Sequence, residues 1–406
     1  MKDQKEEYSN ESYLESVICT SCNKHYSPTQ KLGLCPACNK VLFAQYNLER
    51  AQESFSRNTS NRSYDIWRFL EIMPVVNPKF RYTLGEGWTP ILNLRNAGEH
   101  SGLKNLHLKE EGYNPTGTFK SRGLCAAVSK GIELGIHDFV IPTAGNAGAA
   151  LAAYAACTGT KAHVFMPDDT PSFLQSEVIA LGGELTLIPG LITDAAAQVQ
   201  IAIENQGWFD VSTLKEPYRV EGKKTMGLEL LEQFNWQVPD VIVYPTGGGT
   251  GIVGMWKAFT ELEELGIIGS ERPRMVTVQS STCAPIVRAF EKGRKTAEFW
   301  KNAKTFAPGL RVPAAIGDYL ILNALYESKG TAVVVDDSEI ILAIKELAKL
   351  EGIMQAPEGA STYAGVRKLV ESGEIDSSEL VILFGTGSGF IYPSLWKDIF
   401  LEQNNI

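Results

Sequence analysis

Four glycines stand within five positions, at Gly247, Gly248, Gly249 and Gly251, with Thr250 between the last two. An apolar run precedes them and a helical pattern follows, so a predicted strand leads through this turn into a predicted helix. Glycines let backbone N–H groups approach an anion closely, and a helix N-terminus adds the positive end of its dipole. The segment therefore predicts an anion-binding site.

The glycine spacing by itself leaves open which phosphate is bound. Gly249-x-Gly251-x-x-Gly254 also matches the dinucleotide fingerprint, which expects an acidic residue at the end of the following strand. That predicted strand ends at Gln279 and continues with Ser280, so the acid is absent there. No Gly-Lys-Ser/Thr of a P-loop follows either. The phosphate of a small cofactor remains as the prediction.

Lys120 follows an Asn-Pro-Thr-Gly turn and falls in the first turn of a predicted helix over 119–134. The positive end of the helix dipole repels a cation there and so favours the neutral amine. A neutral lysine amine is the form that bonds covalently to a carbonyl group. An ordinary solvated lysine is the alternative for this residue taken alone.

Two more turns of small residues follow apolar runs. Thr143-Ala-Gly145-Asn146 precedes an alanine-rich helix, and a helix N-terminus of this kind suits a substrate carboxylate. Close packing of the helix is the alternative explanation for its small residues. Thr386 lies in a Gly-Thr-Gly-Ser-Gly turn after the last predicted strand, and this turn alone is a weak signal.

Four of the seven cysteines lie near the start of the chain, at Cys19, Cys22, Cys35 and Cys38. They form two Cys-x2-Cys pairs separated by twelve residues, and each pair is followed by Asn-Lys. Asn tolerates the left-handed conformation that a metal-binding turn often needs after its second cysteine. Four thiolates complete a tetrahedral coordination sphere, so the pattern predicts a structural zinc. Redox cysteines or chance spacing are the alternatives.

From about residue 105 onward, short apolar runs alternate with amphipathic or alanine-rich stretches. Strands are predicted over 105–109, 138–141, 162–166, 184–188, 240–244, 275–279, 331–335 and 380–384. Helices are predicted over 119–134, 147–157, 173–181, 194–205, 225–233, 252–265, 338–350 and 359–371. This alternation indicates two units of parallel sheet covered by helices. Ligands in open α/β folds lie beyond the carboxyl ends of strands, where the glycine-rich turns stand.

The composition is that of a folded, acidic chain. Its 406 residues include 38 Lys+Arg and 47 Asp+Glu, a net charge of −9. Binding along nucleic acid needs a basic surface, so nucleic acid is not an expected partner. No stretch approaches ~18 consecutive apolar residues, so no membrane span is expected, and the polar residues 1–10 do not predict a secretory signal. The cysteines are too few for a disulfide scaffold, so a reducing cytoplasm is expected.

Taken together, these segments resemble the fold-type II enzymes that use pyridoxal 5′-phosphate, and most closely the threonine synthase family. The resemblance extends over about residues 80–392. It includes Gly-Glu-Gly-Trp-Thr-Pro at 85–90, Asn-Pro-Thr-Gly-Thr-Phe-Lys at 114–120 and Tyr-Arg-Val-Glu-Gly-Lys-Lys-Thr at 218–225. The cysteine-rich start resembles the zinc-ribbon extension of some threonine synthases. The resemblance implies two open, twisted α/β domains with parallel sheets, as in the tryptophan synthase β-subunit.

The expected domains are a zinc-ribbon-like head over 1–45, an arm and the start of the large domain over 46–112, a small α/β domain over 113–238 and a large α/β domain with the phosphate turn over 239–406. By its place in the family motifs, Lys120 corresponds to the cofactor lysine.

The resemblance implies roles for the other turns as well. Asn146 corresponds to the residue that contacts the pyridoxal hydroxyl, the turn 247–251 to the phosphate cup, and Thr386 to the residue near the pyridine nitrogen. Thr143 and Gly145 are expected to contact the substrate.

Arg219 corresponds to the arginine that threonine synthases keep for the substrate phosphate. An ion pair with Glu221 is the alternative role for this side chain. Three further charged residues are expected to support the site rather than to react: Glu86, Lys223 and Glu358.

The activity that the resemblance implies is conversion of O-phospho-L-homoserine and water to L-threonine and phosphate, by γ-elimination and then β-addition, in a homodimer. The sequence departs from the family pattern at Ser121, where aspartate is usual, and at Glu216, which adds a negative charge to the segment expected to contact the substrate phosphate. A threonine/serine dehydratase or a phosphoserine-dependent sulfur-transfer synthase is therefore the alternative. An inactive zinc-ribbon interaction protein and a dinucleotide-dependent oxidoreductase are the alternatives from other classes.

Overall fold

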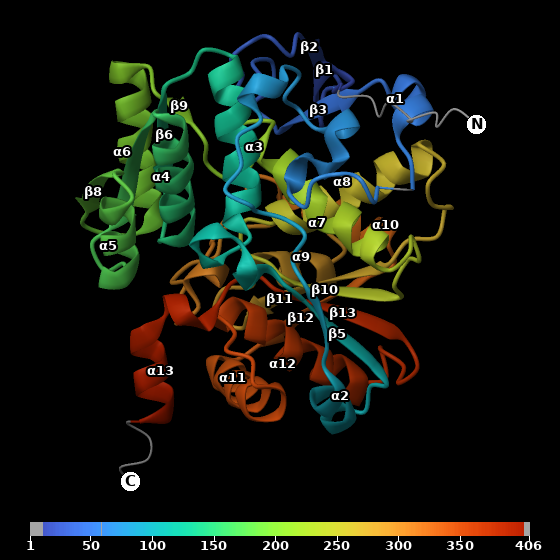
Figure 1. Cartoon of the computed structure of the whole chain (residues 1–406). Helices are drawn as coiled ribbons and strands as arrows, with labels where there is room; N and C mark the ends of the chain where they lie inside the picture. Colours follow the sequence, from blue (N-terminus) through green and yellow to red (C-terminus); the bar gives the residue numbers. More distant parts are fainter. Residues whose placement is uncertain (1–10, 58, 402–406) are drawn as a thin grey trace.

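The computed structural model describes residues 11–57 and 59–401, and its strands form three sheets (Figure 1). The predicted head over 1–45 is therefore described from residue 11 onward, and the predicted large domain over 239–406 as far as residue 401. The polar start at 1–10, which predicts no secretory signal, lies outside the described residues. Within the described part, no helix combines the length and the apolar character needed to cross a membrane.

The head is a small antiparallel sheet with the strand order β2-β1-β3. Its elements are β1 (Leu14–Cys19), β2 (His25–Tyr26), β3 (Leu42–Tyr46) and the following helix α1 (Leu48–Ser54). The apolar residues of the head belong to the same buried cluster as residues of the main body, among them Val17, Leu32, Leu42, Leu214, Tyr218 and Ile321. The head is thus packed into the main core.

A largely irregular arm leads from the head to the first parallel strand. It contains the 3₁₀ helices η1 (Ile66–Ile72) and η2 (Pro78–Phe80), strand β4 (Ile91–Asn93) and helix α2 (Arg95–Ser101). These elements lie within residues 46–112, where the sequence predicts an arm and the start of the large domain.

The smaller parallel sheet has the order β8-β7-β6-β9 and lies at the upper left of Figure 1. Its strands are β6 (Asp138–Pro142), β7 (Lys161–Pro167), β8 (Glu184–Ile188) and β9 (Phe209–Asp210). Its helices are α3 (Lys120–Glu133), α4 (Asn146–Thr158), α5 (Ser172–Ala180) and α6 (Ile192–Gln206).

The larger sheet has six strands in the order β12-β11-β10-β13-β5-β4, and only β4, at one edge, is antiparallel. The parallel strands are β5 (Asn105–Glu110), β10 (Val241–Pro245), β11 (Arg274–Ser280), β12 (Thr331–Val335) and β13 (Leu380–Gly385). The helices of this half are α7 (Arg219–Gln233), α8 (Thr250–Glu264), α9 (Pro285–Glu291), α10 (Asp318–Glu327), α11 (Asp337–Glu351), α12 (Pro357–Glu371) and α13 (Pro393–Phe400). Short 3₁₀ turns occur at η3 (Glu111–Tyr113), η4 (Pro115–Gly117), η5 (Pro308–Leu310) and η6 (Gly389–Ile391).

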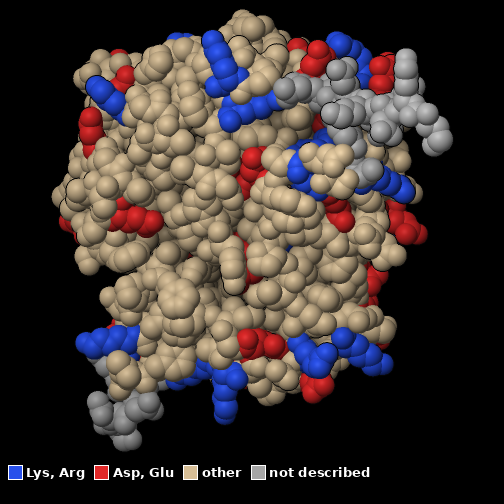
Figure 2. Space-filling model, in the orientation of Figure 1, with Lys and Arg blue, Asp and Glu red and all other residues tan. Residues whose placement is uncertain are grey.

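The predicted α/β class with two parallel-sheet units is confirmed. Every residue of β10 is buried, because helices cover both faces of the sheet, and such strands read as unbroken apolar runs. The eight predicted strands are present, each with bounds within one residue of the prediction. On the face shown in Figure 2, lysine and arginine side chains are interspersed with aspartate and glutamate.

Helices α9, α10 and α13 were not predicted. Among the eight predicted helices, the largest difference in bounds concerns α7, which begins at residue 219 instead of 225. The first turns of α7 carry charged side chains that resemble a surface loop in the sequence. In the structure, Arg219, Glu221 and Lys223 are all buried. Tertiary hydrogen bonds and ion pairs compensate their burial, and a sequence pattern does not show these partners.

Candidate functional site

A cavity of about 260 Å³ lies between the two parallel-sheet units, and a smaller cavity adjoins it. Both are lined by Lys120, Asn146 and Gly248. Six helices begin at the walls. Their first residues are Lys120 of α3, Asn146 of α4, Ile192 of α6, Arg219 of α7, Thr250 of α8 and, one residue before Glu358, Pro357 of α12. Helix N-termini carry partial positive charge, so their convergence favours anionic ligands.

Lys120 is the first residue of α3 and lines both cavities. The amide nitrogen of Phe119 donates a 3.1 Å hydrogen bond to the carbonyl oxygen of Thr386, which ties the start of α3 to the turn after β13. Burial, aided by the Arg219 guanidinium, lowers the pKa of the Lys120 amine to about 7, and Glu358 opposes this shift. A large fraction of Lys120 is therefore neutral near pH 7, and its Nζ is available as a nucleophile or base.

A buried network of charged side chains fixes the Asn-Pro-Thr-Gly turn at 114–117, which precedes Lys120. Arg122 donates through Nε to Glu111 at 2.6 Å and through Nη1 to Glu229 at 2.5 Å, and all three side chains are fully buried. Glu111 also accepts a 2.8 Å hydrogen bond from Asn114 Nδ2. The Oδ1 atom of Asn114 accepts from the backbone of Gly87 at 3.0 Å. The position of the turn is thus fixed by paired groups inside the protein.

Ser121, which departs from the family pattern, is buried and takes part in the same turn. Its hydroxyl donates to the carbonyl oxygen of Pro115 and lies 3.2 Å from the hydroxyl of Thr116. The serine therefore closes the turn locally.

The turn 247–251 forms a cup at the start of α8. Gly249 has a φ of 77°, in the left-handed region, and no side chain caps the helix. A Cβ atom at Gly247 would collide with the backbone of Gly309, and one at Gly251 with the ring of Tyr244. Glycine is therefore required at both positions by close packing. Because no side chain caps α8, its first N–H groups are available to an anion. The cup fits the phosphate group of a small cofactor.

The turn before α4 presents an unsatisfied oxygen at the cavity. Asn146 donates through Nδ2 to the hydroxyl oxygen of Tyr392 at 3.1 Å, while its Oδ1 is buried without a hydrogen-bond partner. The backbone nitrogen of Gly145 donates to Thr143 Oγ1 at 3.1 Å. The structure thus brings the three predicted residues of this turn together at the larger cavity.

Arg219 is buried at the larger cavity with part of its guanidinium unpaired. Its Nη1 donates to the carbonyl oxygen of Val211 at 2.6 Å, but Nε and Nη2 have no hydrogen-bond partner. Glu221 pairs with Lys224 at 2.7 Å instead of with Arg219. The carboxylate of Glu216 accepts from the backbone N–H groups of Tyr218 and Arg219 at the start of α7. Burial lowers the pKa of Arg219 to about 10, opposed by Glu216.

The same wall is also lined by Ser212, Thr213 and Lys215, which were not predicted individually from the sequence. They follow β9, which is only two residues long, so no strand pattern marked the turn. Lys215 lies 3.4 Å from Asp210. The Ser212 hydroxyl donates to Asp210, so the groups left for a ligand on this wall are the Thr213 hydroxyl and the cationic groups of Lys215 and Arg219.

Thr386 and Glu358 line the smaller cavity and belong to the unit that contains the six-stranded sheet. Glu358 accepts through Oε1 from the backbone of Gly309 at 2.7 Å and from the Tyr392 hydroxyl at 3.4 Å. Burial raises the pKa of Glu358, with Lys120 among the groups that oppose the rise. Tyr392 was not singled out in the sequence, because no motif surrounds it.

The two other supporting candidates lie behind the site. Glu86 accepts hydrogen bonds from Leu84 N at 2.9 Å and from the Tyr154 hydroxyl at 2.5 Å. Lys223 donates to the carbonyl oxygen of Phe119, and its Nζ lies 4.1 Å from the centre of that ring. These contacts agree with structural roles.

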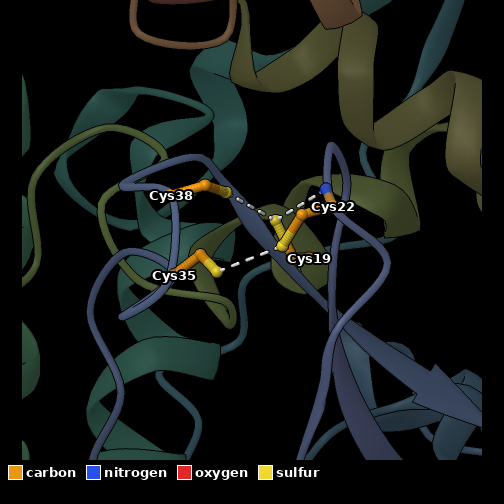
Figure 3. A group of neighbouring side chains, drawn as sticks. All are labelled: Cys19, Cys22, Cys35 and Cys38. Carbon is orange, nitrogen blue, oxygen red and sulfur yellow. Dashed lines mark hydrogen bonds between the residues drawn. The ribbon is translucent and has the colours of Figure 1, made fainter.

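The four predicted cysteine ligands gather in the head, with their sulfur atoms within 4.8 Å of one another (Figure 3). The sulfurs of Cys19 and Cys38 are 3.4 Å apart, and those of Cys22 and Cys35 are 3.7 Å apart. Sulfurs bound to one tetrahedral zinc at about 2.3 Å stand about 3.8 Å apart. The asparagine after each pair has the predicted left-handed conformation, with φ of 57° and 59°. The donor set fits a zinc ion.

Comparisons with known proteins extend these observations. The sequence model described as pyridoxal-phosphate dependent enzyme matches residues 82–387. A threonine synthase of Methanocaldococcus jannaschii is 35% identical over 92% of this chain and 92% of its own length. A threonine synthase of Halalkalibacterium halodurans is 33% identical over 81% of this chain and 91% of its own length.

Solved structures show the same fold at lower identity. Serine racemase from maize superposes with a TM-score of 0.65 at 24% identity, covering 78% of this chain and 94% of that chain. Diaminopropionate ammonia lyase from Escherichia coli superposes with a TM-score of 0.68 at 17% identity, covering 79% of this chain and 89% of that chain. The predicted fold type is thereby confirmed. The chain belongs to the pyridoxal-phosphate-dependent enzyme family and, within it, to the threonine synthases.

Proposed function

We propose that this chain converts O-phospho-L-homoserine and water to L-threonine and phosphate with pyridoxal 5′-phosphate. One observation supports this choice of substrate. The cavity that contains the Lys120 amine also contains a buried arginine, Arg219, with two unpaired nitrogen atoms. A reactive lysine beside a free guanidinium suits an amino acid that bears a phosphate group. The relatives that are named threonine synthase support the same reaction.

Four parts of the cavity wall would hold the cofactor, at Lys120, Asn146, the turn 247–251 and Thr386. Lys120 would be the covalent attachment point, and the uncapped start of α8 with its glycines would bind the phosphate group. Asn146 would hold the ring hydroxyl, and Thr386 would lie near the ring nitrogen. When bound, the cofactor supplies an electron sink for negative charge that develops on the substrate.

Residues of the chain would transfer the protons and bind the substrate. When Lys120 is free of the cofactor, a large fraction of its Nζ is neutral near pH 7, and this amine accepts the proton from the substrate Cα as general base. The turn with Thr143 and Gly145, at the N-terminus of α4, binds the substrate carboxylate. A second proton leaves Cβ as the phosphate leaves from Cγ. A proton then returns to Cγ, the hydroxyl of water adds at Cβ, and a proton returns to Cα.

Arg219 binds the phosphate group of the substrate. Its free Nε and Nη2 atoms form the planar fork that matches two phosphate oxygens. Thr213 and Lys215 lie on the same wall and add a hydroxyl and an ammonium donor. Glu216 does not block this site, because its carboxylate is engaged by backbone N–H groups.

The experiment that tests the proposal is an absorbance spectrum of the purified protein with candidate substrates. We expect the absorbance band of lysine-bound pyridoxal phosphate to shift with O-phosphohomoserine, with release of phosphate and threonine. A shift only with serine, threonine or phosphoserine would assign the dehydratase or sulfur-transfer alternative. Absence of the band after addition of cofactor would exclude this enzymatic function.

We also propose a zinc ion at Cys19, Cys22, Cys35 and Cys38, a homodimer, and a cytoplasmic location. The sulfur positions support the zinc, and the seven cysteines, none of them in a disulfide, agree with a reducing compartment. Metal analysis of the purified protein tests the first proposal, with one zinc per chain expected. Sedimentation tests the dimer.

A further inference from the structure

Tyr392 lies at the start of α13, directly after η6 and beyond residue 387, where the family match ends. It is 7% exposed and belongs to a small apolar cluster with Leu174, Ala356 and Ile391. Leu174 comes from α5 of the smaller sheet unit, whereas Ala356 precedes α12 of the larger one. The aromatic ring is therefore anchored by residues from both sides of the cavity.

The hydroxyl of Tyr392 joins two polar groups that belong to different halves of the site. Its oxygen accepts a 3.1 Å hydrogen bond from Asn146 Nδ2, and it donates to Glu358 Oε1 at 3.4 Å. Asn146 begins α4 of the smaller unit, and Glu358 lies in the first turn of α12 of the larger unit. One phenol thus bridges the cavity.

This bridge decides which end of the Asn146 side chain remains free. With Nδ2 engaged by Tyr392, the Oδ1 atom is left buried and unpartnered at a residue that lines both cavities. Without the hydroxyl, the amide would lose the contact that fixes its rotation. Glu358 has a second anchor, the Gly309 backbone N–H at 2.7 Å, so Asn146 depends more strongly on Tyr392.

We propose that Tyr392 is a positioning residue for the cofactor: its hydroxyl holds the Asn146 amide in one orientation and links it to Glu358 across the cavity. This inference rests on the proposed function, since it requires that Asn146 contacts the bound pyridoxal phosphate. Tyr392 acts through Asn146 and forms no bond to the reacting atoms.

The variant Tyr392→Phe tests this role, because it removes the hydroxyl and keeps the ring in its apolar cluster. Equilibrium dialysis of the full-length holoenzyme against graded pyridoxal phosphate gives the dissociation constant. Loss of one buried hydrogen bond predicts an increase of about tenfold. The absorbance maximum of the bound cofactor is expected to shift as well. Tyr363→Phe is the matched control, since Tyr363 is buried in α12 and its hydroxyl donates to Ala97 O at 3.1 Å, outside the cavity lining.

A double-mutant cycle separates positioning from simple packing. In an Asn146→Ala background, Tyr392→Phe is expected to change the dissociation constant by less than about twofold. An unchanged constant and spectrum in the single variant, or the same loss in both backgrounds, would overturn the inference. Wild-type protein that binds no cofactor would instead contradict the proposed function, so the two failures are distinguishable.

Discussion

The amide nitrogen of Phe119 donates a 3.1 Å hydrogen bond to the carbonyl oxygen of Thr386, residues that lie far apart in the sequence. A second bond, from the amide of Ser388 to the carbonyl oxygen of Gly117 at 2.8 Å, runs beside it. The loop that carries Lys120 and the turn that carries Thr386 are thus paired like two short strands. Lys120 and Thr386 are held at a fixed separation by backbone contacts.

Replacement of the lysine at this paired loop is the first test of the site. We expect Lys120→Ala to lose the absorbance band of covalently bound cofactor and to lower kcat by about 10²–10⁴-fold, the usual contribution of a general base. Lys349→Ala is the control, because Lys349 is exposed in α11. Retention of the band in Lys120→Ala would show that another lysine carries the cofactor.

The rate at which the cofactor-free protein combines with pyridoxal phosphate should depend on pH. The pKa of Lys120 is lowered to about 7, mainly by burial. The neutral amine is the nucleophile, so the rate should be nearly constant well above pH 7 and fall about tenfold per pH unit well below it. Stopped-flow absorbance measures this rate. A midpoint near the ordinary lysine pKa of about 10.4 would contradict the neutral state near pH 7.

Arg219→Lys should weaken binding of the substrate phosphate, since the ammonium group cannot form the planar fork. We expect KM for O-phosphohomoserine to rise about 10- to 100-fold, in line with the loss of a charge-assisted bidentate contact. The affinity for pyridoxal phosphate in the same variant serves as the control and should change little. An unchanged KM would indicate that other residues of the cavity wall, and not Arg219, bind the substrate phosphate.

Arg122→Met should destabilise the fold, because it leaves Glu111 and Glu229 buried with part of their charge uncompensated. The expected cost is about 3–5 kcal/mol in the free energy of unfolding, measured in urea. Arg294→Met is the matched control, since Arg294 and its partner Glu298 are largely exposed, and exposed pairs contribute about 0–1 kcal/mol. Equal effects of the two replacements would refute the structural role of the buried network.

Cys19→Ser should abolish the proposed zinc site and lower the melting temperature. Zinc bound by four thiolates stabilises small domains directly, so its loss removes stabilisation from the head. Atomic absorption and calorimetry measure the two effects. Cys157→Ser, at an exposed thiol outside the cysteine cluster, should retain the metal. Full zinc content in Cys19→Ser would rule out the predicted ligand set.

The sequence predicted those parts of the site whose signal is contiguous. The strand, the glycine turn and the helix at 240–264 follow one another along the chain, so local patterns locate the turn that lines the cavity. The same is true for the turns that carry Lys120 and Asn146. Each of these turns follows a strand of a parallel sheet, at the end where the fold class places ligands.

The residues that the sequence could not predict reach the cavity through tertiary structure alone. Tyr392 is placed by an apolar cluster assembled from three segments, and Ser212 follows a strand too short to show a periodic pattern. The first turns of α7 were missed because Lys223 and Glu221 are charged, and only their buried partners make a helix there stable. Propensity rules assume that charged residues face water.

The head packs against the segments that carry Lys215 and Arg219 of the cavity lining. The hydroxyl of Thr20 lies 2.5 Å from the hydroxyl of Tyr319, and Leu32 shares one apolar cluster with Leu214 and Tyr218. Leu214 and Tyr218 flank Lys215 and Arg219 in the sequence. A chain shortened by its first 45 residues would therefore expose apolar surface beside this cavity and be prone to aggregate. Cooperative unfolding of head and body in one transition is the thermodynamic consequence.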